Sequence, residues 1–140
     1  MADHKFYTPG LFNVGSYQVS GMPWISGSID HAVNTEVKYE FPMVTKSVTV
    51  MNHTDDAIRV HFNSTSHDIA GSSIMTKQHY IELDSDEDSF TFNVKCKEIY
   101  ISAQNNGSAR EYKVYAELTH IRTDRMYALT GSGLTEGAGE

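Results

Sequence analysis

Apolar and polar residues alternate through the middle of the chain. Within residues 35–41, Val37, Tyr39 and Phe41 lie on one side of the alternation, with charged residues between them. Because successive side chains of a strand point to opposite faces, this period of two predicts a half-buried β-strand. Pro42 has no N–H to donate to a neighbouring strand, so we expect the strand to end there.

The same pattern recurs at short intervals toward the C-terminus. Further strands are expected over residues 47–51, 58–62, 79–83, 90–96, 99–103 and 111–121. Clusters of Asn, Asp, Ser and Gly separate them, and such residues favour turns. The Asn106-Gly107 pair predicts a hairpin turn between the last two strands, because it tolerates positive φ. The loose stretch over 63–75 is expected to cross from one sheet to the other.

The spacing of these segments predicts an all-β fold. No stretch shows an apolar stripe of helical period and length. About seven strands with turns at regular spacing indicate a single antiparallel β-sandwich over residues 35–130. A jelly roll and an immunoglobulin-like sandwich satisfy the pattern equally. The length of 140 residues suits one domain.

The two ends of the chain differ from the middle. Residues 1–34 read as an extended N-terminal arm with large apolar groups and glycines but without clean alternation, and residues 131–140 read as a flexible C-terminal tail. Two hypotheses compete for the arm: it packs on its own domain as an irregular first strand, or it becomes ordered on a neighbouring subunit. The candidate interface residues are Phe6, Tyr7, Phe12, Tyr17, Trp24 and Ile25.

Composition and charge exclude several classes of partner. A net charge of −7 disfavours binding to phosphate backbones, so no nucleic acid is expected. No apolar run approaches the roughly 18 residues of a spanning helix, and the N-terminus does not resemble a signal peptide. The single cysteine, Cys96, rules out an internal disulfide and is interpreted as a small buried hydrophobe.

The chain lacks the sequence motifs of common reactive sites. Its seven histidines form no H-x-H or H-E-x-x-H pattern, so no metal or other cofactor is expected. The acidic turn at 84–88 lacks the EF-hand glycine and glutamate and is interpreted as a solvated loop tip. No nucleophile elbow or phosphate loop occurs, so we predict no enzyme activity and no catalytic residue. Tyr100 and Tyr115 lie opposite the apolar face of their strands and are candidate contacts for a sugar or a protein partner.

Near the N-terminus, residues 12–28 read FNVGSYQVSGMPWISGS, and residues 130–135 read TGSGLT. These segments resemble small virion structural proteins of tailed marine phages, including cyanophages, of the capsid decoration or cement type. The resemblance implies a non-enzymatic protein of the virion, made in the bacterial host cytoplasm, that binds the major capsid protein or a tail protein. It also implies a homo-oligomer, with a trimer as one option. A tail, baseplate or fibre component and a carbohydrate-binding module remain the alternatives.

Overall fold

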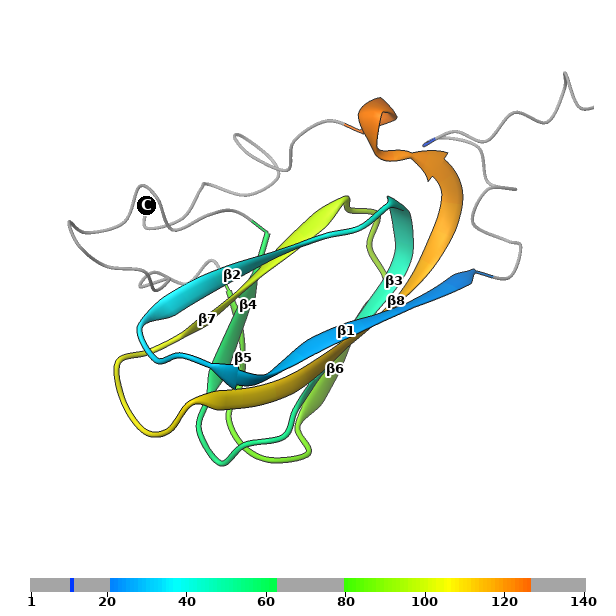
Figure 1. Ribbon diagram of the computed structural model, residues 1–140. Coiled ribbons are helices and arrows are strands. Elements are labelled where there is room, and N and C mark those ends of the chain that lie inside the picture. The colour runs from blue at the N-terminus through cyan, green and yellow to red at the C-terminus, as the bar shows by residue number, and fades with distance from the viewer. Residues whose placement is uncertain (1–10, 12–20, 63–79, 127–140) are drawn as a thin grey trace, which may run out of the picture.

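The computed structural model describes residues 11, 21–62 and 80–126 (Figure 1). This part of the chain is built from eight strands and one short 3-10 helix, η3 (Thr123–Arg125). The strands are β1 (Met22–His31), β2 (Thr35–Glu40), β3 (Met43–Asn52), β4 (Ile58–His61), β5 (Ile81–Leu83), β6 (Ser89–Phe92), β7 (Glu98–Ala103) and β8 (Arg110–Arg122). No helix in the described ranges is long and apolar enough to cross a membrane.

The strands form two antiparallel four-stranded sheets that pack face to face (Figure 1). One sheet has the order β1-β8-β3-β6 and the other has the order β2-β7-β4-β5. The predicted antiparallel sandwich is therefore confirmed. Eight strands wound between two sheets in this order form a jelly roll, which decides between the two sandwich types left open by the sequence.

The core lies between the two sheets and is filled by aliphatic side chains. In β8, Val114 and Ala116 are completely buried, and Tyr112 and Leu118 are at most 4% exposed, as the alternation predicts. Facing them across the sandwich are the buried residues Ile58, Val60, Ile99 and Ile101. Burial of such side chains contributes about 1.5–3 kcal/mol each, which makes this layer the main source of stability.

The sandwich extends further toward the N-terminus than the sequence predicts. Residues 22–31 form β1 and pair with β8 in a register that joins Met22 to Leu118 and Ser28 to Tyr112. The expected domain boundary after residue 34 is therefore wrong, and the expected seven strands are eight. For residues 22–31, the hypothesis of packing on the same domain holds. Residues 1–10 and 12–20 of the predicted arm and the predicted tail at 131–140 lie outside the described residues.

Two predicted connections are also corrected. Gly107 has the positive φ of 68° that the Asn-Gly pair predicts, but β7 and β8 belong to different sheets, so this turn crosses the sandwich. Conversely, β4 and β5 pair within one sheet, with Ile58 opposite Leu83, so the chain does not change sheets between them. Local turn chemistry determines where the chain reverses, whereas the pairing partner depends on packing of the whole sandwich.

A buried arginine organises the end of the sandwich where the β3–β4 and β7–β8 turns meet. Arg110 is completely buried and donates hydrogen bonds to the carbonyl oxygens of Ala57 (3.0 Å), Asn106 (2.7 Å) and Ser108. Its guanidinium also lies 3.9 Å from the carboxylate of Asp56. These bonds satisfy the buried charge and hold the two turns together.

Candidate functional site

The outward face of β1 carries the two most exposed large hydrophobic side chains of the described residues. Ile25 is 70% exposed and Ile29 is 84% exposed. Together with Gly27, they line a shallow surface groove of about 330 Å³ whose other wall comes from Glu111 and Lys113 of β8. Isoleucine is usually buried, so two of them exposed on one edge strand mark this face as a candidate binding surface.

The candidate surface continues across the sheet and becomes polar. Ile25 lies beside Tyr115 of β8, and Tyr115 lies beside Thr49 of β3. At the far edge, the hydroxyl groups of Thr49 and Thr91 are 2.9 Å apart and hydrogen-bonded. The apolar side chains of this outer face lie mainly on β1, and the half-buried Tyr115 of β8 and Met51 of β3 are further members.

Gly27 is required for the close fit of β1 against β8. Its φ is 156°, a value that residues with a side chain rarely adopt. A Cβ atom at this position would overlap the backbone carbonyl oxygen of Tyr112. The glycine therefore lets the two backbones approach closely and leaves the floor of the groove between Ile25 and Ile29 open.

The inward face of β1 is fixed to the core at both ends. The indole of Trp24 packs edge-on against the ring of Phe41, with ring centroids 4.9 Å apart. At the other end, the imidazole Nε2 of His31 lies 3.0 Å from the carbonyl oxygen of Thr35, and its Nδ1 lies 2.6 Å from the hydroxyl of Tyr112. These contacts give β1 a defined position, so its outer face is presented rigidly.

The hydrogen bonds of His31 define the tautomer of its neutral imidazole. A carbonyl oxygen only accepts, so Nε2 carries the proton, and in the neutral ring Nδ1 then accepts from the hydroxyl of Tyr112. The Tyr112 oxygen in turn accepts from the hydroxyl of Tyr39 at 2.9 Å. Burial lowers the pKa of His31, the Thr35 carbonyl partly opposes this shift, and the charge of Arg110 lowers the pKa further. Burial also raises the pKa values of Tyr39 and Tyr112, so the network is neutral.

The predicted interface residues separate into three groups. Ile25 is exposed, as an interface residue must be, whereas Trp24 is half-buried against its own core and is not available as an anchor. Phe6, Tyr7, Phe12 and Tyr17 lie outside the described residues. Ile29 was missed by the sequence reasoning. Counting alternate positions from Trp24 would have placed both isoleucines on the opposite face.

Tyr100 and Tyr115 do not form one platform. Tyr115 lies on the outer face of the β1-β8-β3-β6 sheet, and Tyr100 lies on the outer face of the other sheet. The ring of Tyr100 stacks on that of His61 at 5.8 Å, and its hydroxyl donates to Glu98 at 2.6 Å. Burial, followed by this hydrogen bond, raises the pKa of Tyr100 to about 12. A sugar-stacking site that uses both tyrosines is therefore incompatible with the fold.

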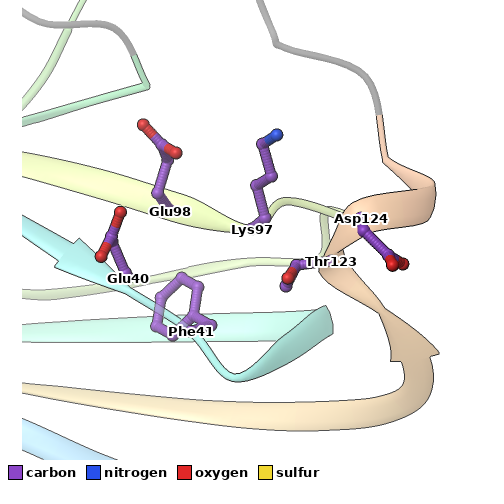
Figure 2. Close-up of a pocket in the computed structure, with 6 residues that line it drawn as sticks. All are labelled: Glu40, Phe41, Lys97, Glu98, Thr123 and Asp124. Atoms are coloured by element: carbon purple, nitrogen blue, oxygen red, sulfur yellow. The ribbon is translucent and has the colours of Figure 1, made fainter.

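A second pocket, of about 320 Å³, lies at the end of the sandwich next to η3. Figure 2 shows its lining residues, Glu40, Phe41, Lys97, Glu98, Thr123 and Asp124. Glu40 and Glu98 are cross-strand partners, and the ammonium group of Lys38 lies 3.1 Å from the first and 3.4 Å from the second. Lys38 therefore forms an ion pair with each of the two carboxylates at the rim of this pocket.

The remaining reactive groups are Cys96 and a small cluster on the turns. Cys96 is completely buried, as predicted, and burial raises the pKa of its thiol to about 11, which keeps it protonated and unreactive. His53, Asp86 and Glu87 place one potential ligand atom each within 4.8 Å of one another. The sequence reasoning considered the acidic turn alone and missed His53, because the two turns are distant in sequence and meet only in the fold.

No protein-family model, curated protein or solved structure matches this chain.

Proposed function

We propose that this chain is a non-enzymatic virion structural protein that decorates and stabilises the outer surface of a phage head. The observation that carries the proposal is the exposure of Ile25 (70%) and Ile29 (84%) on the outward face of a firmly anchored edge strand. The segment that resembles phage virion proteins, residues 12–28, includes the first part of this strand. Jelly rolls are common in viral capsid proteins, although the fold alone does not define a function.

The proposed contact has two parts. The outer face of β1 is a preorganised apolar surface, and binding to such a surface avoids the entropy cost of ordering it. The four aromatic residues predicted as anchors precede β1 directly in sequence: Phe6, Tyr7, Phe12 and Tyr17. In this proposal, they extend the contact from β1 along the major capsid protein. The protein acts as a homo-oligomer, with a trimer as one option.

The proposal is tested by converting the exposed isoleucines to serine. The double variant Ile25→Ser/Ile29→Ser should lose affinity for capsids of the encoding phage by about 100-fold or more, since burying each side chain is worth about 1.5–3 kcal/mol. Co-sedimentation with capsids that lack this protein measures the binding. Ile81→Ser is the matched control, because Ile81 is also exposed (39%) but lies on the other sheet. Undiminished binding by the double variant would overturn the proposal.

A location in the tail, baseplate or a fibre is the second candidate, because the same apolar face would fit a tail protein equally well. Electron microscopy of virions with a gold label on this chain distinguishes the two locations. Label on the head supports a decoration protein. Label on the tail would identify a tail protein, and not the major capsid protein, as the partner. The β1 face remains the predicted contact in that case.

A further inference from the structure

The turns between β3 and β4 and between β5 and β6 lie side by side at one end of the sandwich (Figure 1). The N–H of Asn52 donates to the carbonyl oxygen of Asp88 at 2.8 Å, and the N–H of Glu87 donates to the carbonyl oxygen of Asn52 at 2.7 Å. The N–H of His53 donates to the carbonyl oxygen of Glu111 at 2.8 Å. These backbone bonds extend the sheet beyond the strand ends and fix His53 next to the acidic turn.

Three side chains from these turns converge. The Nδ1 atom of His53 lies 3.4 Å from Oε1 of Glu87, and with a carboxylate oxygen of Asp86 they form a group whose members are all within 4.8 Å. Neighbouring side chains in an extended segment point apart. Glu87 has a φ of 71°, which bends the backbone and lets the side chains of Asp86 and Glu87 face the same imidazole.

The chemistry of the group indicates the kind of ion it suits. One imidazole nitrogen and two carboxylate oxygens are typical ligands of Zn²⁺, whereas Ca²⁺ requires about 6–8 oxygens. Zinc–ligand distances of about 2.0–2.2 Å place ligand atoms roughly 3.3–3.6 Å apart in a tetrahedral site. The distance of 3.4 Å between His53 and Glu87 already satisfies this requirement. The three ligand atoms all lie within 4.8 Å of one another, and Asp86 is exposed, so its carboxylate can rotate closer to the other two ligand atoms.

We propose that His53, Asp86 and Glu87 bind one divalent transition-metal ion, with Zn²⁺ as the best fit. A water molecule completes the tetrahedron. The ion joins the β3–β4 turn to the β5–β6 turn and reinforces the backbone bonds between them. The three proposed ligands lie on turns at the end of the sandwich and include no residue of β1, although the N–H of His53 bonds to the carbonyl oxygen of Glu111, which also lines the groove beside β1.

Calorimetric titration of the full-length, chelator-treated protein with zinc chloride tests the proposal. We expect one zinc ion bound per chain. Removal of an outer-shell partner typically weakens metal binding about 10–100-fold, and loss of a direct ligand should cost at least as much, so His53→Ala should weaken binding tenfold or more. His120→Ala is the matched control, because His120 is exposed on β8 and distant in sequence from both turns; it should bind zinc normally.

Two further measurements make the test specific. Zinc should raise the melting temperature of the wild-type protein but not of His53→Ala, because an ion that binds only the folded state stabilises it by mass action. The variant Asp86→Asn/Glu87→Gln, which keeps the side-chain sizes, should also lose binding. The proposal is overturned by zinc binding that is unchanged in His53→Ala, by absence of zinc binding, or by calcium binding more tightly than zinc.

Discussion

The two faces of β1 make opposite uses of large apolar side chains. On the inner face, Trp24 packs against Phe41 and His31 closes a hydrogen-bonded network with Tyr112. On the outer face, Ile25 and Ile29 are mostly exposed, with only Gly27 between them. One strand of ten residues therefore both completes the sandwich and presents an apolar surface.

The two faces of β1 therefore have separable effects. The inner contacts hold the strand in register on β8, so the outer side chains contribute little to folding and are available for the proposed contact. Substitutions on the inner face should therefore reduce stability, and those on the outer face should reduce only binding. The following predictions test that separation, in order of decreasing effect on stability.

The largest effect is expected for Trp24→Ala. Complete truncation of a core aromatic costs about 3–5 kcal/mol, and because Trp24 is only half-buried we expect a loss of about 2–4 kcal/mol in the free energy of unfolding. Urea denaturation measures it. Ile25→Ala, at the next position and on the other face, is the control and should change stability by less than about 0.5 kcal/mol. An equal loss in both variants would remove the distinction between the two faces.

Gly27→Ala should be destabilising by about 1–3 kcal/mol, because the new Cβ meets the carbonyl oxygen of Tyr112 in a backbone conformation that favours glycine. The result would show that the groove between the isoleucines depends on close contact of β1 with β8. Ser26→Ala on the same strand provides a control without this clash. A Gly27→Ala protein as stable as the control would contradict the predicted requirement for glycine.

The next effect is a dependence of stability on pH through His31. Burial lowers its pKa in the folded state below the ordinary value of 6.5, so at lower pH the unfolded chain binds more protons. The neutral His31 therefore contributes fully above about pH 6.5, and this contribution declines as the pH falls below that value. The slope from one group is at most about 1.4 kcal/mol per pH unit.

Melting temperatures between pH 7.5 and pH 5 measure the contribution of His31. In His31→Gln, the decrease on acidification should be smaller than in the wild type, whereas His120→Gln, an exposed substitution on β8, should leave the decrease unchanged. The groups closest to the imidazole are Tyr112, Tyr39 and Arg110, and none of these is expected to change its charge in this pH range. Identical pH profiles for wild type and His31→Gln would refute the assignment.

The smallest effect on stability is expected for Ile25→Ser/Ile29→Ser. Both side chains are already mostly exposed, so the free energy of unfolding should change by less than about 0.5 kcal/mol. Thermal and urea unfolding of the isolated protein measure this. Substantial destabilisation would mean that the outer face supports the fold, and a loss of capsid binding would then no longer identify it as a contact surface.

The sequence predicted the strands whose two faces differ in polarity. In β8, inward Tyr112, Val114 and Ala116 alternate with exposed or half-buried residues, so the period of two was readable. In β1 it was not, because Trp24 points inward while Ile25 points outward. Apolar residues on both faces conceal the alternation, and the strand was therefore interpreted as part of an irregular arm.

The sequence alone determined the all-β class, the approximate strand positions, the burial of Cys96 and the positive φ of Gly107, since each depends on local periodicity or local backbone chemistry. Only the tertiary structure decided the jelly-roll strand order, the placement of Tyr100 and Tyr115 on opposite faces, and the meeting of His53 with Asp86 and Glu87. These features join segments far apart in the chain, and long-range pairing is set by packing of the whole sandwich rather than by any local pattern. The tertiary structure also decided which face of β1 is buried. This strand has apolar residues on both faces, and only its pairing with β8 and the packing of Trp24 on Phe41 turn one of them toward the core.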